Sequence, residues 1–253
     1  MTRPTTEPAE AHATSEARAT EQQDRIWEYY QNETPEGFEG ALPRVRFLAE
    51  RIQRLRPGAR VLNVGVGAGT FEREALRLGL EVSSLDPSER SIATLRDELR
   101  LGERAQVGYS QEMPFEDASF DCVVLSEVLE HLTSHVQHAT LEEVRRVLAP
   151  DGLFLGTVPA EENLDQGRVV CPDCGHRFHR WGHLHSFDPT SLEELLRRAF
   201  RVERVFERSF ASFRGRKGVF GKLKRALRVA LLSAGLVGAP RDTCVLVFEA
   251  RPL

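Results

Sequence analysis

Short apolar runs alternate with amphipathic stretches through the middle of the chain. Runs of strand length are expected at 60–65, 80–85, 106–109, 120–126 and 152–158, and stretches with a helical period lie between them at 69–78, 89–100 and 140–148. Buried strands that alternate with helices are typical of a parallel sheet covered by helices on both faces. The pattern therefore predicts a doubly wound α/β fold.

The flanking segments extend this picture. Two helices are expected near 24–30 and 42–55, a further helix opens at Asp188-Pro189, and strand patterns follow at 202–206 and 244–248. Thr140 and Glu143 form a capping-box pattern for the helix at 140–148. Residues 1–22 show no apolar period and predict a disordered tail. We expect one catalytic domain over 23–253, with insertions at 160–186 and 212–240.

The first strand runs directly into three alternate glycines, Gly65, Gly67 and Gly69. Glycine permits a positive φ and the close approach of a ligand to the backbone. Asp86 stands 21 positions after Gly65, at the end of the next strand, where a carboxylate can accept hydrogen bonds from both ribose hydroxyls. Dinucleotide sites have a third glycine where this chain has Thr70. The loop therefore predicts a nucleoside cofactor and favours S-adenosylmethionine over NAD.

Five segments, in this order along the chain, resemble the motifs of class I S-adenosylmethionine-dependent methyltransferases. Their sequences are similar to those of the ubiquinone-biosynthesis O-methyltransferase group. The segments are Val61 to Phe71, Asp86, Met113-Pro114-Phe115, Phe120 to Leu132 and Arg146 to Gly152. The resemblance spans about residues 40–210. It implies a Rossmann-like, seven-stranded sheet of order 3-2-1-4-5-7-6 whose last strand is antiparallel, with the Cys/His insertion after strand 5.

The resemblance also implies a set of cofactor-binding residues. The family usually has an acid where this chain has Asn63, and another near the adenine where it has Tyr109-Ser110. Contacts to adenine are then expected from Ser110, Gln111 and backbone amides, while Ser126 and Glu127 would lie near the methyl group. The implied set is Asn63, Gly65, Gly67, Gly69, Asp86, Ser110, Gln111, Ser126 and Glu127.

The insertion concentrates two cysteines and four histidines within fifteen residues, 171–185. The run Cys-Pro-Asp-Cys-Gly is typical of a zinc knuckle, in which two thiolates approach one ion from a tight turn. We expect Cys171, Cys174, His179 and His183 to bind a structural zinc, with His176 and His185 as alternative ligands. The competing interpretation is that these are incidental polar residues of a loop.

Methyl transfer requires alignment of the nucleophile and exclusion of water, and a base only for some acceptors. His185 and His131 are the candidate bases, and one histidine of 182–187 is expected to face the substrate. Which of His183 and His185 binds zinc and which faces the pocket stays open. Trp27, Tyr29 and Tyr30 would either close over the cofactor as a lid or pack in the core.

Charge and composition limit the kinds of partner that the protein is expected to bind. The net charge is −4, but nine Lys and Arg and no acidic residue lie between Glu207 and Asp242. The acidic remainder argues against a specific nucleic-acid partner, while a basic helix at 219–234 predicts either a solvated face or weak contact with an anionic membrane. No apolar run or leader pattern indicates a membrane span or secretion, so we expect a cytoplasmic protein.

These observations predict an S-adenosylmethionine-dependent methyltransferase. Its acceptor would be an O or N nucleophile of a small-molecule or lipid- or nucleotide-linked substrate. The alternative is a non-catalytic, S-adenosylmethionine-binding scaffold protein on the same fold, because function depends on the site and not on the fold.

Overall fold

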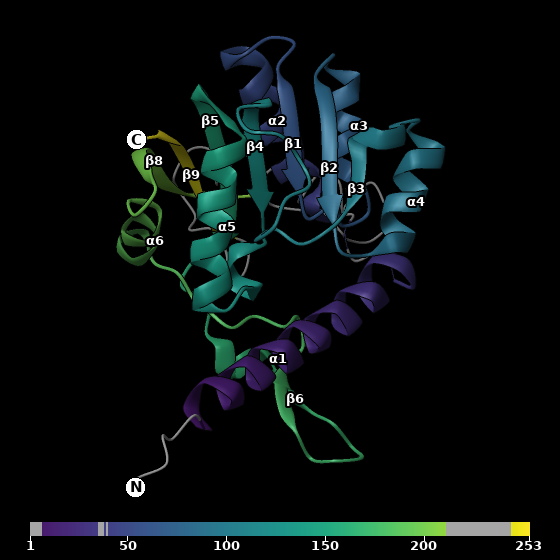
Figure 1. The fold of residues 1–253 in the computed structure, drawn as a ribbon, viewed down its shortest axis with the longest axis vertical. Helices are drawn as coiled ribbons and strands as arrows, with labels where there is room; N and C mark the ends of the chain where they lie inside the picture. Colours follow the sequence, from purple (N-terminus) through teal and green to yellow (C-terminus); the bar gives the residue numbers. More distant parts are fainter. Residues whose placement is uncertain (1–6, 35–37, 39, 211–243) are drawn as a thin grey trace, which may run out of the picture.

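Seven strands form one mixed sheet in the computed structural model, which describes residues 7–34, 38, 40–210 and 244–253 (Figure 1). The strand order is β3-β2-β1-β4-β5-β9-β8, and β9 runs antiparallel to both of its neighbours. Two short strands, β6 and β7, pair separately as a hairpin. Without that hairpin the order is 3-2-1-4-5-7-6, so the expected topology is confirmed. The strands are β1 (Arg60–Val64), β2 (Glu81–Asp86), β3 (Ala105–Val107), β4 (Phe120–Ser126), β5 (Leu148–Pro159), β6 (Arg168–Val170), β7 (Arg177–His179), β8 (Phe200–Ser209) and β9 (Cys244–Pro252).

Helices cover both faces of the sheet because the central strands are apolar on both sides. In β4, for example, Cys122 and Val124 belong to one buried cluster, and Val123 and Leu125 belong to the other. Parallel strands buried on both faces carry continuous apolar runs for this reason. One face packs against α2 (Leu42–Leu55), α3 (Thr70–Arg77) and α4 (Glu89–Glu98), and the other against α5 (Ser134–Val147) and α6 (Pro189–Leu196).

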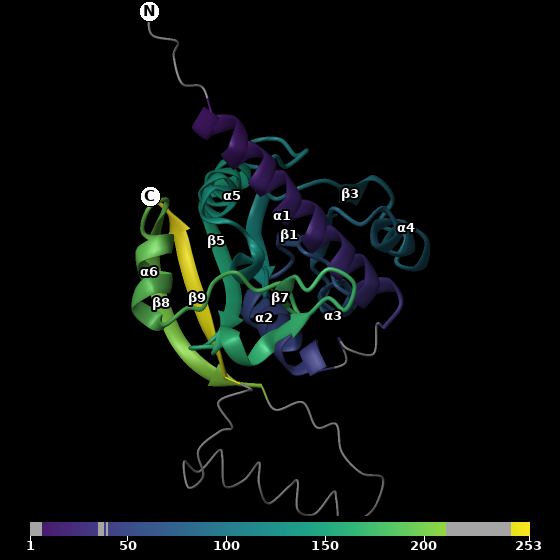
Figure 2. The same cartoon turned by 90° about the horizontal axis from the view of Figure 1, so that it is seen from below.

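The N-terminal region differs from the expected tail. Helix α1 (Glu7–Asn32) begins well inside the stretch for which the sequence predicts disorder. Alanine, glutamate, glutamine and arginine have high intrinsic helix propensity, so a segment without an apolar period can still be helical. Figures 1 and 2 show α1 as one long rod that crosses the carboxyl ends of the central strands.

Helix α5 begins earlier than the sequence pattern predicts. Its N-cap is Thr133, whose hydroxyl accepts from the Val136 amide, and the expected capping box at Thr140 is wrong. The Thr140 hydroxyl instead pairs with Ser110, and Glu143 accepts from the Met113 amide. Both side chains therefore connect α5 to the loop after β3. The N-cap predicted at Asp188 for α6 is confirmed, as a capping box with Ser191.

The two expected insertions have different outcomes. Residues 160–186 leave β5 and contain the β6–β7 hairpin, which lies beneath α1 in Figure 1. The basic insertion at 212–240, with its helix at 219–234, lies outside the described residues. No helix in the described part of the chain has the length and apolar character that a membrane span requires.

The buried carboxylate of Glu72, on α3, connects this helix to β1 and β2. Glu72 is fully buried, and its Oε1 accepts from Asn63 Nδ2 at 2.7 Å and from the Ser84 hydroxyl at 2.9 Å. Its second oxygen meets no partner among the described residues. Burial raises the pKa of Glu72 to about 7, although the two side-chain hydrogen bonds oppose the rise.

This shift makes stability depend on pH, and Glu72→Gln should remove that dependence. The folded protein holds the proton more tightly than the unfolded chain, so ionisation destabilises it as pH rises from about 4.5 to about 7. The penalty is complete above that window and reaches about 3 kcal/mol. We therefore expect the variant's advantage in free energy of unfolding to be larger at pH 8 than at pH 5, measured by urea denaturation at both values.

The matched control is Glu81→Gln, at the exposed start of β2. It should leave the pH profile of the wild-type protein unchanged. A Glu72→Gln profile parallel to that of the wild type would contradict the assignment.

Candidate active site

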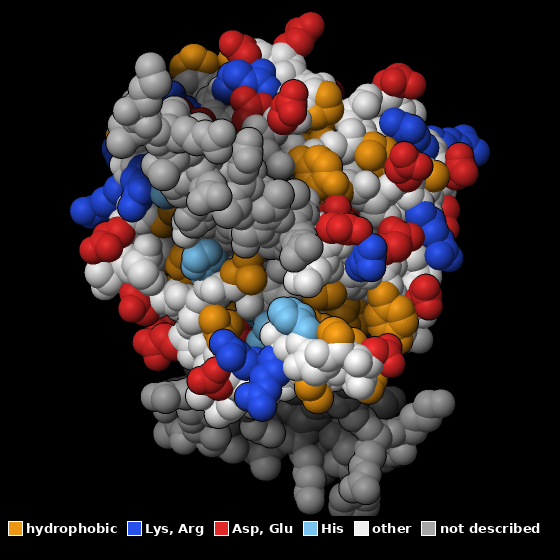
Figure 3. Space-filling model, turned by 60° about the horizontal axis from the view of Figure 1, so that its bottom comes forward, with side chains coloured by type: hydrophobic (Ala, Val, Ile, Leu, Met, Phe, Trp, Pro, Cys, Tyr) orange, Lys and Arg blue, Asp and Glu red, His pale blue; other side chains and the backbone are white. Residues whose placement is uncertain are grey.

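A cavity of about 1510 Å³ lies at the carboxyl ends of β1, β2 and β4, between the sheet and α1. Small-molecule pockets usually enclose about 300–1,000 Å³, so this cavity has room for two ligands. Parallel α/β sheets bind ligands at this end because the connecting loops diverge there. On the face drawn in Figure 3, histidine side chains lie among hydrophobic ones, and most charged side chains lie around them.

The glycine loop forms one wall of the cavity. Gly65 and Gly67 line it with φ values of 84° and 51°, a region that L side chains rarely adopt. A Cβ on Gly67 would lie 2.9 Å from the Phe38 ring, so the backbone must stay bare there. Gly69 does not line the cavity and instead caps α3 with φ 70°. The three predicted glycines thus divide into two that face the cavity and one that starts a helix.

Asp86, at the end of β2, anchors this wall. Its Oδ2 accepts from the Val66 amide at 2.9 Å, and its Oδ1 accepts from the Ser88 amide at 2.9 Å. Gln31 of α1 also donates to Oδ2, at 3.2 Å. Burial raises the pKa of Asp86, and these three hydrogen bonds oppose that rise. The carboxylate therefore faces the cavity while it connects β2, the glycine loop and α1.

The side of the cavity nearest β3 is formed by Tyr109, Ser110 and Gln111. The Tyr109 hydroxyl donates to Asp24 Oδ2 of α1 at 2.8 Å, while the Ser110 hydroxyl pairs with Thr140 at 2.8 Å. The Ser110 hydroxyl, predicted to contact adenine, therefore already has a hydrogen-bond partner within this chain, Thr140. Asn63 lines the cavity but points its amide toward Glu72.

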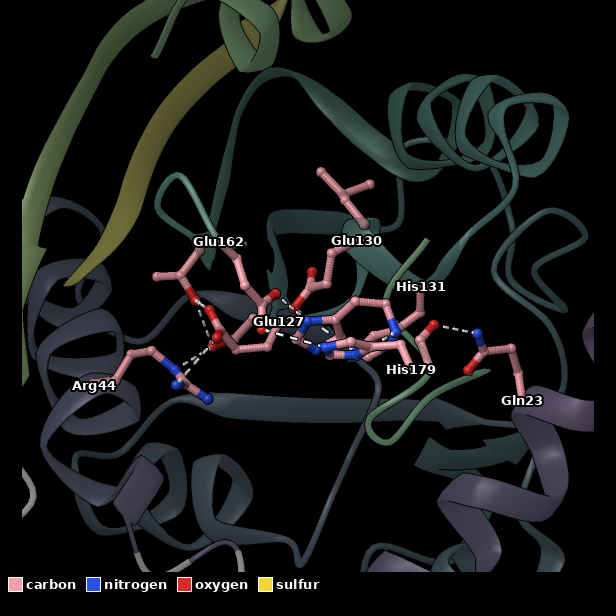
Figure 4. A network of polar contacts seen from close by, with 12 residues as sticks. Gln23, Arg44, Glu127, Glu130, His131, Glu162 and His179 are labelled. Atoms are coloured by element: carbon pink, nitrogen blue, oxygen red, sulfur yellow. Dashed lines mark hydrogen bonds and ion pairs between the residues drawn. The ribbon is translucent and has the colours of Figure 1, made fainter. Parts of the chain in front are cut away.

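A group of polar side chains lies at the carboxyl end of β4, where the predicted residues Ser126 and Glu127 stand. Glu127 adopts φ 60°, an uncommon conformation for a residue other than glycine. Thr157 donates to its Oε1 at 2.8 Å, and Arg44 lies 3.6 Å from its Oε2. Arg44 also donates to the Ser126 hydroxyl at 3.0 Å. The backbone turn and these contacts hold the Glu127 carboxylate at the cavity (Figure 4).

Of the two histidines predicted as bases, only His131 lines the cavity. It is 7% exposed and packs edge-on against Trp27, with ring centroids 4.7 Å apart. Burial, followed by the charge of His183, lowers the pKa of His131 well below its usual value. His185 is outside the cavity lining, whereas His183 is part of it. The predicted base His185 therefore lies outside the cavity, and of the pair that the sequence left open it is His183 that reaches the cavity.

The four predicted zinc ligands do not come together. In the described part of the chain, the groups with metal-ligand spacing are Glu130, His131 and His183, and Glu162, His179 and His183. Neither contains a cysteine. His179 pairs with Arg168 at the base of the hairpin, and Cys171 lies three residues further along, about 10 Å toward the tip. The short β7 strand therefore carries the histidines away from the knuckle.

The cysteines nevertheless form the turn expected of a knuckle. The Gly175 amide donates to the Cys171 carbonyl at 2.9 Å, and Gly175 has φ 71°. Hydrogen bonds from the backbone of Cys174 and Asp173 lower the pKa of the Cys171 thiol. The cysteines offer two sulfur ligands on an accessible turn, separate from the histidines.

Sequence patterns missed several residues that shape the cavity. Glu162 lies just beyond β5 and hydrogen-bonds to His183 Nδ1, with its other oxygen 3.7 Å from His179 Nε2. Burial raises the pKa of Glu162, but the hydrogen bond and charge of His183 outweigh it, so the pKa is lowered. Glu130 is completely buried beside His131, and burial raises its pKa well above the usual value. Only its place in the quoted motif beside His131 could have drawn attention to Glu130.

Comparison with known proteins identifies the family. A family model described as "Methyltransferase domain" matches residues 38–201. A sterol 24-C-methyltransferase of Gibberella zeae is 34% identical over 151 residues, which are 53% of this chain and 38% of that protein. A ubiquinone biosynthesis O-methyltransferase of Xanthomonas campestris is 34% identical over 126 residues, 46% of this chain and 48% of that protein. The chain spans less than half the length of these curated relatives.

Solved structures agree on the fold. A Burkholderia thailandensis 1,6-didemethyltoxoflavin-N1-methyltransferase, solved with 1,6-didemethyltoxoflavin and S-adenosylhomocysteine, aligns with a TM-score of 0.62 and 20% identity over 100% of this chain and 93% of its own. The [4+2]-cyclase SpnF aligns with a TM-score of 0.57 and 19% identity, covering 83% of this chain and 81% of its own. Since the family model spans the glycine loop, Asp86 and β1 to β5, the chain belongs to the methyltransferase domain family, in its class I S-adenosylmethionine-dependent group.

Proposed function

We propose that this protein transfers the methyl group of S-adenosylmethionine to an O or N nucleophile of a small-molecule or lipid- or nucleotide-linked acceptor. One observation carries the proposal. A single cavity extends from the glycine loop and Asp86 to His131, Glu162 and His183 beyond β4 and β5. It therefore joins a nucleoside-binding half to a second half of different chemistry.

In the first half, we assign Asp86 to the ribose hydroxyls. Its carboxylate is held by the Val66 and Ser88 amides, and Gln31 donates where a ribose hydroxyl would donate. Gly65 and Gly67 leave room for the amino-acid part of the cofactor, and Ser126 and Glu127 lie toward the methyl group. The adenine would lie against Tyr109 and Gln111, because Ser110 is occupied by Thr140. In this assignment Gly69 does not face the cofactor, and its part is to cap the start of α3.

The second half is rich in aromatic surface. Trp27 and Tyr30 of α1 and Trp181 of the insertion line it, with the Tyr30 and Trp181 rings 4.5 Å apart. Flat aromatic walls favour an acceptor that carries a ring. The ubiquinone and toxoflavin methyltransferases among the similar proteins are named for ring-bearing compounds, which supports the same class here.

The reaction is an in-line displacement at the sulfonium carbon. An oxygen or nitrogen of the acceptor attacks the methyl carbon, the carbon–sulfur bond breaks, and its electron pair stays on S-adenosylhomocysteine. A hydroxyl or protonated amine acceptor releases one proton. The protein's tasks in such a step are to align the two reactants and to limit the access of water, and residues of α1 and of the insertion line the cavity where this would take place.

We expect Asp86→Ala to weaken binding of S-adenosylhomocysteine by at least about 100-fold. The reason is the loss of two hydrogen bonds to a charged acceptor, each worth about 1.5–3 kcal/mol. Titration calorimetry measures the change. Asp121→Ala is the matched control, because Asp121 also accepts a backbone amide, that of Arg60, but at the opposite end of the sheet.

The control should bind as tightly as the wild type. Equal affinities for the Asp86→Ala and wild-type proteins, with both folded by circular dichroism, would remove Asp86 from the site.

Turnover separates the enzyme from the alternative scaffold protein. We expect S-adenosylhomocysteine to form when the protein is incubated with S-adenosylmethionine and a panel of phenols and ring amines, and a labelled methyl group to appear in the acceptor. Mass spectrometry of both products gives the stoichiometry. Tight binding of S-adenosylhomocysteine without transfer to any member of a broad panel would favour the scaffold interpretation.

A further inference from the structure

We propose that Glu130, His131 and His183 form a binding site for a divalent transition-metal ion, such as Zn²⁺, in the second half of the cavity. Glu162 positions His183 in this site. The ligands come from the segment after β4 and from the insertion. Figure 4 shows Glu130 and His131 close to Glu162 and His179 of the insertion. The site differs from the predicted knuckle because no cysteine takes part.

The spacing of the donor atoms suits a metal ion. One ligand atom from each of Glu130, His131 and His183 lies within 4.8 Å of the others, and Glu130 Oε1 is 3.7 Å from His131 Nε2. Donors at about 2.0–2.1 Å from a tetrahedral zinc are about 3.4 Å apart. Small side-chain rotations would therefore complete the coordination.

Unpartnered polar atoms point to a ligand at this place. Within the described residues, both carboxylate oxygens of Glu130 and both ring nitrogens of His131 meet no hydrogen-bond partner. The side chains are 0% and 7% exposed. The Gly182 carbonyl lies near the His131 ring, but it already accepts from Gln23 and is outside hydrogen-bond geometry for the ring. Buried polar groups rarely remain unpaired, and a cation would satisfy them.

Glu162 gives His183 the tautomer that a metal ligand needs. The Glu162 carboxylate accepts from His183 Nδ1, which leaves Nε2 with a free electron pair. A histidine that donates its other N–H to a carboxylate is the usual arrangement around protein-bound metals. Glu162 itself lines the cavity and is better placed as this positioning residue than as a ligand.

The neighbouring group of Glu162, His179 and His183 is less suited to a metal. His179 Nδ1 accepts from the His183 amide at 3.2 Å, so the ring proton must reside on Nε2, which is the nitrogen that faces Glu162. That nitrogen has no electron pair to offer in this tautomer. His179 therefore packs against the His183 ring, with centroids 4.6 Å apart, and supports it.

Two imidazoles and one carboxylate favour zinc and its neighbours over calcium or magnesium. Three protein ligands also leave a coordination position open, as in catalytic zinc sites. Because His131 and His183 line the cavity, that position would face the acceptor. This role rests on the proposed function: an acceptor hydroxyl bound to the ion would lose its proton more readily before it attacks the methyl group.

Metal binding to the whole 253-residue chain tests the site directly. After removal of metal with a chelator, titration with Zn²⁺ should show about one equivalent bound. His183→Ala should weaken that binding by more than about 100-fold, and Glu162→Gln by about 10- to 100-fold, the range for residues that orient a ligand. His185→Ala is the matched control, because His185 is two residues away and outside the cavity lining.

One further variant and one spectroscopic measurement separate this site from the knuckle. Cys171→Ser should keep the zinc equivalent, and Co²⁺-loaded protein should lack a thiolate-to-cobalt charge-transfer band. Loss of zinc in Cys171→Ser with its retention in His183→Ala would overturn the proposal. So would failure of the wild-type protein to bind Zn²⁺, whether or not it binds S-adenosylhomocysteine.

The Glu130→Gln variant distinguishes a loss of metal binding from a general folding defect. Without metal, this change removes a buried carboxyl group that has no partner, so the melting temperature should be equal to or above that of the wild type. With Zn²⁺, the wild type should gain melting temperature and the variant should gain much less. S-adenosylhomocysteine binding should persist in both His183→Ala and Glu130→Gln, which keeps this test separate from that of the proposed function. An equal gain from Zn²⁺ in the wild type and in Glu130→Gln would exclude Glu130 as a ligand.

Discussion

A single buried carboxylate organises the cofactor half of this molecule. Asp86 ends β2, but its two oxygens accept amides from the glycine loop after β1 and from the turn into α4, and Gln31 reaches it from α1. Three segments that are distant in the sequence thus share one acceptor. Burying this charge costs free energy, which the converging donors offset. The glycine conformations at 65 and 67 keep backbone and ligand close to it, so the shape of this half depends on the contact.

The second half of the cavity shows the opposite condition, because buried polar side-chain atoms there lack hydrogen-bond partners among the described residues. The side-chain polar atoms of Glu130 and His131 have no hydrogen-bond partner in the part of the chain that the structure describes. The neighbouring carboxylates of Glu127 and Glu162 do have partners, in Thr157, Arg44 and His183. A core tolerates such groups where function requires them and where packing elsewhere supplies the stability. Here the two large apolar clusters on either face of the sheet supply it. The cavity therefore combines a half whose central carboxylate, Asp86, is hydrogen-bonded on both oxygens with a half in which buried polar side-chain atoms have no partner among the described residues.

Local period and turn residues were sufficient for the alternating α/β pattern, and the family resemblance implied the sheet order that the structure has. The glycine loop was recognised as well, although the sequence did not separate Gly69 from the two glycines that line the cavity. The sequence was insufficient where three-dimensional contacts decide. Thr140 looked like a helix cap but serves as a partner for Ser110, and α1 forms in a segment without an apolar period. Cys171 and His179 are eight positions apart, yet the hairpin separates them, whereas His131 and His183 are brought together from distant segments. No local pattern encodes the direction of a side chain that leaves a loop.

Helix α1 touches both halves at once. Gln31 bonds to Asp86 at one end, Trp27 packs on His131 in the middle, and Gln23 donates to Gly182 of the insertion further along. These three contacts are on one continuous helix, so the same element closes both parts of the cavity. A single helix thus serves as the shared wall of two neighbouring binding regions that different strands of the sheet line from below.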